Sequence, residues 1–542
     1  MNFFVAQDEA RRASRRLVFA YIVATALIVA GVSVIISAAL YTLSDARNYV
    51  SLGRFVADNW ALPATAALVT VLVIVGASAF KTAALSSGGA AVASQMGGTQ
   101  VAPDVQEPLR RRLHNVVEEM AIASGIPVPD VFVLEEESGI NAFAAGFSPS
   151  DAAVAVTRGA LELLDRDELQ GVIAHEFSHV LNGDMRLNIR LMGVLFGIMV
   201  ISLIGRMILR GTRFSGSSSR RGGGVAVVLI LGLGLTILGW IGMFAARIIK
   251  AGVSRQREYL ADASAVQFTR QTRGIADALK KIGGYGHGSR IEAKDPEEVS
   301  HMLFGTGSKL AGLFATHPPL HDRIQALDPS FRVSDFPDID ARRESQRIRE
   351  EAAGISQFTS TATAPVASAL PDVMSASVGQ PDAQHVEYAR QLRSTIPTAL
   401  YDAAHSTELA YLLAIALVVD PSGRNTDRQL GLVRDQLGAQ RANVVQRLRD
   451  DLAGTGAEYR LPILEVAFPA LKRRPAEELG FLIELVTRLI EADGEIDLYE
   501  FCFYRILVSN LKRASNPAAR QHRAKRKDLQ REAVNLLRVL AD

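Results

Sequence analysis

The sequence predicts a mainly α-helical integral membrane protein that also contains a small β-sheet and an all-α C-terminal domain. Three observations lead to this fold class. Four long apolar runs lie within the first 250 residues, segments rich in β-forming residues precede a helix with two histidines, and the composition changes near residue 340. We therefore expect about four transmembrane helices, one for each run.

The overall composition limits the classes of protein that the chain can represent. It has 542 residues, of which 48% are hydrophobic, and a mean hydropathy of +0.15, and this length predicts more than one domain. The single cysteine, Cys502, excludes an intramolecular disulfide and a cysteine-rich zinc ribbon. The net charge is only +2, so no nucleic-acid partner is expected.

The first two apolar runs, 17–42 and 60–80, contain no charged residue, and each has the roughly 20 residues that a membrane-spanning helix requires. The first run is too long for a signal peptide and lacks a small-residue cleavage site. Two arginines lie between the runs, whereas the segment before the first run carries four: Arg11, Arg12, Arg15 and Arg16. The positive-inside rule therefore places the N-terminus and the chain after residue 81 in the cytoplasm.

The other two apolar runs, 191–205 and 224–246, form a candidate hairpin. The second run is long enough to span the membrane, and the first is borderline. Five arginines separate them, and a spanning hairpin would place these arginines outside, against the positive-inside rule. A partly inserted hairpin or a pair of buried core helices are the alternatives, and we favour the spanning hairpin.

The segment LDRDELQGVIAHEFSHVLNG predicts a largely buried helix. Asp165 and Glu168 have the spacing of a capping box, Gly183 is a suitable stop, and apolar residues recur at helical spacing. His175 and His179 differ by only about 40° around the helix axis, so both can reach one zinc ion. A pair of histidines buried without a metal is the alternative.

Glu176 and a carboxylate later in the chain complete the pattern. Glu176 follows the first histidine, where it can take a proton from water beside a metal. Just after the fourth apolar run, Glu258 and Asp262 lie one helical turn apart in SRQREYLADASAV. If the hairpin returns the chain to the side it left, Glu258 can be the third zinc ligand and Asp262 can orient a ligand histidine. An ordinary solvated helix is the alternative.

Four motifs follow one another in the chain, in the order GINAFAAGF, AHEFSHVLNGD, SRQREYLADASA and THPPLHDRIQAL. By these motifs the chain resembles the HtpX group of membrane zinc metalloproteases, which is related to the CAAX-prenyl endopeptidases. The resemblance covers roughly residues 15–330. It implies a zincin-type catalytic domain, an active-site helix beside a small sheet, in a mainly α membrane protein.

The resemblance also implies roles for individual residues. One Zn²⁺ per chain would be held by His175, His179 and Glu258, with Glu176 as general base and Asp262 in an outer position. His317 of the His-Pro-Pro motif and Arg323 would assist the substrate or the oxyanion. His321 occupies a position where the group often has an acidic residue, which leaves open which histidine assists catalysis, and we favour His317 because its Pro-Pro context matches the motif.

Substrate is expected to bind along an exposed strand edge. Residues 131–136, 141–146 and 152–159 predict short strands, with SPSD as a turn. An extended peptide can add to such an edge through its backbone. The resemblance implies that Asn141, Ala142 and Phe143 contact substrate, and an Asx turn is the alternative role for Asn141.

The function implied is zinc-dependent cleavage of misfolded or surplus membrane proteins, with zinc-activated water as the nucleophile. The expected partners are peptide or membrane-protein substrates and the lipid bilayer, and the expected location is the bacterial inner membrane, with the active site in the cytoplasm. A non-enzymatic membrane scaffold is the alternative from another class, and prenyl-peptide processing is the alternative within the enzymes.

The C-terminal third predicts a helical domain joined by a flexible linker. Residues 336–385 are rich in Ser, Thr, Ala and Pro after a charged helical stretch, and 386–542 alternate amphipathic patterns with short breaks. The apolar stretch 409–419 is too short to span a membrane and is expected in a core helix. Because its composition differs from that of the rest of the chain, this domain is a candidate for binding a regulatory partner.

The stretch LIEADGEIDLYEF near the end partly matches an EF-hand loop. Four residues fit positions 5, 6, 8 and 12 of that loop: Asp493, Gly494, Ile496 and Glu500. Leu489 stands at position 1, where a carboxylate is required, so calcium binding is not expected. The stretch is similar to the TerB-type helical domain of tellurite-resistance proteins, with a plain helix-turn-helix as the alternative.

The expected organisation has six segments. They are a transmembrane pair (1–82), the first part of the catalytic domain (83–187), a membrane hairpin (188–250), the second part of the catalytic domain (251–335), the linker (336–385) and the helical domain (386–542).

Overall fold

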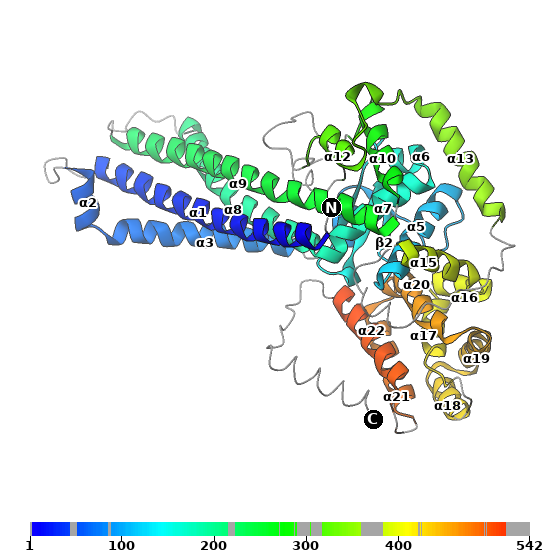
Figure 1. Ribbon diagram of the computed structural model, residues 1–542. Coiled ribbons are helices and arrows are strands. Elements are labelled where there is room, and N and C mark those ends of the chain that lie inside the picture. Colours follow the sequence, from blue (N-terminus) through cyan, green and yellow to red (C-terminus); the bar gives the residue numbers. More distant parts are fainter. Residues whose placement is uncertain are drawn as a thin grey trace.

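The structure is a computed structural model in which a long helical bundle projects from a larger globular region (Figure 1). It describes residues 3–43, 51–84, 88–214, 223–269, 271–286, 288–289, 304, 317–358, 383–420, 423, 425–492, 494 and 496–515. The turn that carries Asp493 lies outside these residues, so the structure does not describe the EF-hand-like stretch as a whole.

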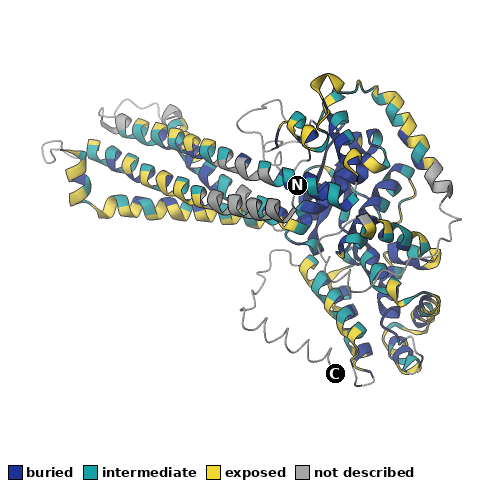
Figure 2. Cartoon of the chain, viewed as in Figure 1, coloured by how far each residue is buried: buried dark blue, intermediate teal, exposed yellow. Residues whose placement is uncertain are grey.

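Four helices form the bundle, and each carries a candidate membrane span. They are α1 (Phe3–Leu43), α3 (Ala61–Ala84), α8 (Asp184–Phe214) and α9 (Gly223–Thr269), and the spans within them are Ile22–Thr42, Ala61–Ala83, Asp184–Gly211 and Val227–Ala245. Helix α1 packs against α3 and α9, and α8 packs against α3 and α9. Large apolar side chains cover the outer surface of the bundle, whereas the buried residues concentrate in the globular region (Figure 2). The prediction of a mainly helical integral membrane protein is confirmed, with four candidate membrane helices in the described part of the chain.

Glycines allow α8 to approach its two neighbours closely. A Cβ added to Gly197 would lie 2.5 Å from the Ile74 carbonyl oxygen of α3, and one added to Gly205 would lie 2.5 Å from the Thr236 nitrogen of α9. Small residues at such crossings let helix backbones pack closely in lipid.

Helix α9 continues without a break from the membrane span into the globular region. It has 47 residues and is therefore about 70 Å long. The sequence had suggested a boundary near residue 250 between the hairpin and the second part of the catalytic domain, but the structure has one helix across that point. Glu258 thus lies 13 residues beyond Ala245, the end of the span.

The far end of the bundle carries the short helix α2 (Leu52–Asp58), and the C-terminal end of α8 and the N-terminal end of α9 lie at the same end (Figure 1). Arg206 and Arg210 of α8 are therefore directed toward the end of the bundle that is remote from the globular region. This arrangement is that of a full hairpin.

The globular region contains a four-stranded sheet in the order β1-β2-β4-β3. Strand β1 (Gly98–Gln100) pairs antiparallel with β2 (Asp130–Leu134), β2 pairs parallel with β4 (Ala153–Thr157), and β4 pairs antiparallel with β3 (Ala142–Ala145). The three predicted strands are present, and β1 was not predicted. Strand β3 is at one edge of the sheet, as expected, but all four of its residues are buried, whereas an exposed edge was predicted.

Helices cover both faces of this sheet. Helix α4 (Gly89–Gln95) covers one face, and α5 (Pro108–Ser124) and α7 (Arg166–Asn182) belong to the larger core on the other. Helix α7 begins with the predicted capping box, in which Asp165 and Glu168 each accept from the other's backbone N–H, and ends at Gly183, whose φ of 72° suits glycine. Three shorter helices complete this core: α6 (Arg158–Leu163) packs against β4 and α5, α10 (Thr272–Gly284) packs against α7, and α12 (Leu320–Leu327) packs against α10.

The C-terminal region is helical throughout its described part. After α13 (Ala341–Phe358), a second core gathers eight helices: α15 (Ala383–Thr395), α16 (Thr398–His405), α17 (Leu409–Ala416), α18 (Thr426–Leu437), α19 (Ala439–Ala453), α20 (Arg460–Lys472), α21 (Ala476–Ile490) and α22 (Leu498–Ser515). Helix α17 is fully buried, as predicted for that apolar stretch. Helices α13, α15 and α20 pack against α5, so the two regions meet along that helix.

Candidate metal centre

Three side chains from two helices meet at one point beside β3. The Nε2 atoms of His175 and His179, both on α7, lie 3.2 Å apart. The carboxylate oxygens of Glu258 on α9 lie 3.5 Å from the first nitrogen and 3.7 Å from the second. A tetrahedral zinc ion with bonds of about 2.1 Å separates its ligand atoms by about 3.4 Å. The three donor atoms therefore have the separations that a zinc ion requires.

An outer carboxylate fixes the orientation of each histidine. His175 Nδ1 lies 2.9 Å from Asp262 Oδ1, and His179 Nδ1 lies 2.9 Å from Asp184 Oδ2. Because a carboxylate accepts, each Nδ1 carries the hydrogen and each Nε2 presents a lone pair. Two facing lone pairs at 3.2 Å need a cation between them. The residues present fit a zinc ion.

Burial and neighbouring charge set the ionisation of the three ligands. Burial raises the pKa of Glu258, but His317 and His175 hold it well below its usual range, so Glu258 is an anion. Burial and the His175 charge lower the pKa of His179, which favours its neutral form. For His175, burial lowers the pKa, but Asp262 and Glu258 outweigh burial and raise the pKa to about 9. In the absence of a metal, His175 is thus the group that holds a proton.

Glu176 is buried beside the ligand set without being part of it. The residue is 1% exposed. Among the described residues no side chain donates to its carboxylate, and the only hydrogen-bonding group that influences its pKa is the backbone of Ala144. Burial raises the pKa of Glu176, while His175 and His179 counteract this effect. A buried carboxylate that no side chain neutralises is costly, so such a group is typical of a site where it has a chemical role.

The His-Pro-Pro segment brings His317 to the centre and leaves His321 away from it. His317 is buried, and its Nδ1 lies 2.8 Å from Glu258 Oε2. The His321 side chain is 38% exposed and pairs with Asp322. Of the two histidines between which the sequence left the choice open, the structure places only His317 at the metal ligands.

Arg323 is fully buried beside Asp262, and its Nη1 also lies 3.6 Å from Glu258 Oε2. Its Nε and Nη2 atoms donate to the two oxygens of Asp262 at 2.8 and 2.7 Å, and its Nη1 donates to the Phe304 carbonyl at 2.8 Å. These bonds direct the guanidinium at Asp262, which in turn orients His175. The geometry favours a positioning role for Arg323 over the predicted direct role at the oxyanion.

The predicted substrate segment forms the edge strand, but its first residues already have partners. The Asn141 side chain donates to the Ser289 carbonyl at 2.7 Å, and the Ala142 carbonyl accepts from Phe304 N–H at 2.8 Å. Phe143 belongs to the core on the α4 side of the sheet. Because outward-facing backbone groups alternate along an edge strand, Ala144 is the next residue whose backbone faces away from β4.

Two residues of the site were missed by sequence reasoning. Asp184, which holds His179, follows the Gly183 stop and starts α8. Phe304 packs its ring on His175 with centroids 4.9 Å apart and lies under the Arg323 guanidinium. The signal for Asp184 was its position one residue after the end of the histidine helix, whereas no local pattern marks Phe304.

Comparisons with known proteins agree with this geometry. Residues 108–330 match the family model described as peptidase family M48. The protease HtpX homolog of Thermoanaerobacter pseudethanolicus is 42% identical over 223 residues, which are 40% of this chain and 70% of that protein. The chain belongs to peptidase family M48. The protease HtpX homolog of Streptococcus pyogenes serotype M28 is 35% identical over 282 residues, which are 51% of this chain and 89% of that protein.

Membership of the M48 family makes this chain a zinc metallopeptidase of the HtpX type, and His175, His179 and Glu258 are its candidate zinc site. No solved structure matches the chain. The family match ends at residue 330, so the C-terminal helical region has no assigned family, and its likeness to a TerB-type domain stays a prediction.

Proposed function

We propose that this M48 peptidase cleaves misfolded or surplus membrane proteins at the cytoplasmic face of the bacterial inner membrane. The observation that carries the proposal is the position of Glu176, which is buried and bonded by no side chain in the described structure, beside three side chains arranged for zinc. A membrane scaffold would gain nothing from such a group. The chain's relatives in bacteria and its four candidate spans support the membrane location.

The chemistry divides between the metal and the protein. A zinc ion held by His175, His179 and Glu258 supplies the Lewis acidity that activates water and polarises the scissile carbonyl. Glu176 accepts a proton from the attacking water on a carboxylate oxygen and returns it to the leaving amine nitrogen. The raised pKa of Glu176 suits both steps, because a carboxylate whose pKa lies nearer to neutral pH both accepts and returns a proton more readily than an exposed glutamate.

The remaining site residues position these groups. Asp262 holds His175, Arg323 holds Asp262, and His317 contacts Glu258. We propose that an extended substrate pairs with the β3 edge at Ala144, beyond the point where Phe304 occupies Ala142. Asn141 and Phe143 then shape the strand through their own buried contacts, and the binding depends mainly on the substrate backbone.

The membrane anchor supplies selectivity for substrates. Helix α9 carries Glu258 about 20 Å beyond the end of its span, so cleavage occurs on polypeptide that extends a similar distance from the bilayer. Backbone-driven binding needs an extended segment, and a folded loop does not offer one. Unfolded loops of membrane proteins meet both conditions.

The substitution Glu176→Gln tests the proposed base. We expect the cleavage rate of a membrane protein with an unfolded cytoplasmic loop, co-reconstituted in liposomes, to fall about 10²–10⁴-fold. Zinc content, measured by mass spectrometry on the same sample, should not change. Glu162→Gln, at a partly exposed glutamate paired with Arg349, is the matched control. Full cleavage by Glu176→Gln would contradict the proposal, and absence of both zinc and chelator-sensitive cleavage in the unaltered protein would favour the scaffold.

A further inference from the structure

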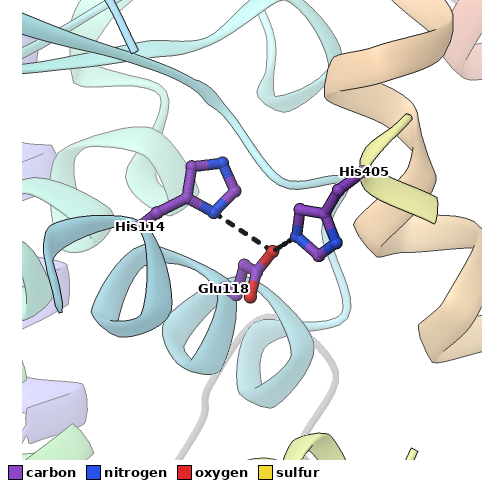
Figure 3. Close-up of side chains that lie close together, drawn as sticks. All are labelled: His114, Glu118 and His405. Carbon is purple, nitrogen blue, oxygen red and sulfur yellow. Dashed lines mark hydrogen bonds and ion pairs between the residues drawn. The ribbon is translucent and has the colours of Figure 1, made fainter. Parts of the chain in front are cut away.

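A second cluster of two histidines and a glutamate lies where the catalytic region meets the C-terminal helices. His114 and Glu118 are one turn apart on α5, and His405 is the last residue of α16. All three are buried, with exposed fractions of 3%, 0% and 4%. Figure 3 shows both imidazoles directed at the carboxylate of Glu118.

The contacts of this cluster require a cation within it. His405 Nδ1 lies 2.7 Å from the Tyr401 carbonyl oxygen, and since that oxygen can only accept, Nδ1 carries the hydrogen. His405 Nε2, on the other side of the ring, faces Glu118 Oε1. A lone pair on Nε2 and a carboxylate oxygen repel one another, so the close contact between them requires a cation, which is a proton at this separation and which a metal ion can replace.

The third member and the surroundings favour a metal. His114 Nδ1 lies 3.1 Å from the same Oε1, so two imidazole nitrogens and one carboxylate converge. The Tyr401 hydroxyl donates to Glu118 Oε2 at 2.8 Å and fixes the carboxylate from outside. An imidazole held by a backbone carbonyl and a carboxylate held by a further hydrogen bond are the outer contacts that metal ligands make.

Neighbouring charges leave the Glu118 carboxylate available. Arg393 lies 3.9 Å from Glu118 Oε2, but its Nη1 donates to Asn115 and Tyr401, and its Nε lies 3.5 Å from Glu119. Glu119 is also held by two bonds from Arg166, at 2.8 and 2.6 Å. The guanidinium charges near the cluster are thus directed mainly at Glu119.

We propose that His114, Glu118 and His405 form a second site, for a divalent transition-metal ion such as Zn²⁺, that is shared between the catalytic region and the C-terminal helices. The donor atoms of the three residues all lie within 4.8 Å of one another, and the set of two imidazoles and one carboxylate is that of the first centre. The second site is independent of the proposed proteolysis, since none of its residues belongs to the first centre.

A metal at this site would fasten α16 to α5. The next residue on α5, Glu119, binds Arg166 in the first turn of α7, the helix that carries His175 and His179. The second site is therefore joined to the active-site helix through adjacent residues of α5, which gives the C-terminal region a route by which to stabilise that helix.

Zinc stoichiometry of the full chain in detergent, dialysed against zinc-buffered solution, tests the proposal. We expect two zinc ions per chain in the unaltered protein and one in His405→Gln, in His114→Gln and in His179→Gln. His385→Gln, in the same C-terminal region but outside the cluster, should retain two. One zinc ion in the unaltered protein, or two in both His405→Gln and His114→Gln, would overturn the second site and leave the first centre unaffected.

A thermal measurement guards against loss of folding in these variants. In the His179→Gln background, added zinc should raise the unfolding temperature through the second site alone. The rise should disappear in His179→Gln/His405→Gln and persist in His179→Gln/His385→Gln. An equal rise in all three variants, or none in His179→Gln, would show that the cluster holds only a proton.

Discussion

At the scale of single residues, the centre depends on side chains that never touch the metal. Asp262 and Asp184 each hold the Nδ1 of one histidine and so direct both Nε2 atoms at one point. Asp184 also forms an ion pair with Arg257, the residue before the ligand Glu258. One carboxylate thus connects the end of the histidine helix to the helix that carries the third ligand.

Asp184→Asn should weaken zinc binding without removing a ligand. The amide can hold His179 less firmly and lowers the basicity of its imidazole, and loss of such an outer partner typically lowers metal affinity about 10–100-fold. Competition with a chromophoric chelator measures this change. Asp277→Asn, which alters a partly exposed carboxylate paired with Lys280, is the control. Unchanged affinity in Asp184→Asn would refute the role assigned to this residue.

Glu344 should make the docking of α13 sensitive to acid. Hydrogen bonds from Arg347 and Lys281 outweigh burial and lower the pKa of Glu344 to about 2. Because the pKa is lower in the folded state, this stabilisation is present above about pH 4.5 and is lost as pH falls toward 2. Glu344→Gln should cost about 1 kcal/mol at pH 7, a value that allows for solvent screening, and less at pH 3.

Urea unfolding of the unaltered protein and of Glu344→Gln, each at pH 7 and pH 3, measures the difference in the free energy of unfolding. Glu350→Gln on the same helix, where the exposed carboxylate accepts from Gln346, should show little difference at either pH. A cost for Glu344→Gln that is equal at pH 3 and pH 7 would exclude the ionised carboxylate as its source.

The three candidate ligands and Glu176 could be predicted from helical spacing, from the position of Glu258 after the hairpin and from the resemblance of the motifs to a known family. His175, Glu176 and His179 share one helical stretch, and Glu258 lies in a motif of its own. Asp184 was missed because an aspartate after a glycine stop is also an ordinary helix start. The position of Arg323 in the sequence suggested a place at the site, but only its bonds to Asp262 show how it is used.

At the scale of elements, the bundle is held together by close approaches of backbone. Gly197 of α8 faces α3, where an added Cβ would lie 2.5 Å from the Ile74 carbonyl oxygen and 2.4 Å from the Ser78 hydroxyl. A backbone oxygen cannot rotate away as the end of a side chain can. The two helices must therefore separate if this position gains a side chain.

Gly197→Ala should lower the stability of the bundle by about 1–3 kcal/mol, the usual cost of overpacking. The unfolding temperature in detergent reports this change. Gly76→Ala, on α3 in the same pair of helices, adds a methyl group with nothing within 4 Å and is the matched control. Equal unfolding temperatures for the two variants would refute the close packing of α3 and α8.

Element boundaries were less predictable than element types. Apolar length identified the four candidate spans, and short runs of β-forming residues bounded by a turn identified three strands. Strand β1 has only three residues, which give too short a pattern. The continuity of α9 was hidden because charged residues after the span look like the end of a helix. Tertiary contacts with α7 and α10 support the helix there instead.

At the scale of the whole molecule, the bundle sets the sidedness of the protein. Helix α2 and the C-terminal end of α8 lie at one end, and the sheet and both helical cores lie at the other (Figure 1). Composition predicted a helical C-terminal region but not its packing on α5, because contacts between distant segments leave no periodic signal in either segment.

Cysteine labelling in intact cells should show this sidedness. In a Cys502→Ser background, Arg54→Cys on α2 and Arg210→Cys on α8, both exposed positions, should react with a membrane-impermeant maleimide added outside. Thr99→Cys on β1 should react only after permeabilisation. If Arg210→Cys reacts only after permeabilisation, as Thr99→Cys does, while Arg54→Cys reacts from outside, a spanning hairpin of α8 and α9 is excluded.

The unbroken α9 also has a mechanical consequence. Since Glu258 stands about 20 Å past the end of the span on one rigid rod, a change of about 5° in the tilt of that rod displaces its carboxylate by nearly 2 Å. Helix tilt responds to bilayer thickness. A change in the thickness of the surrounding bilayer would thus change the distance from Glu258 to His175 and His179.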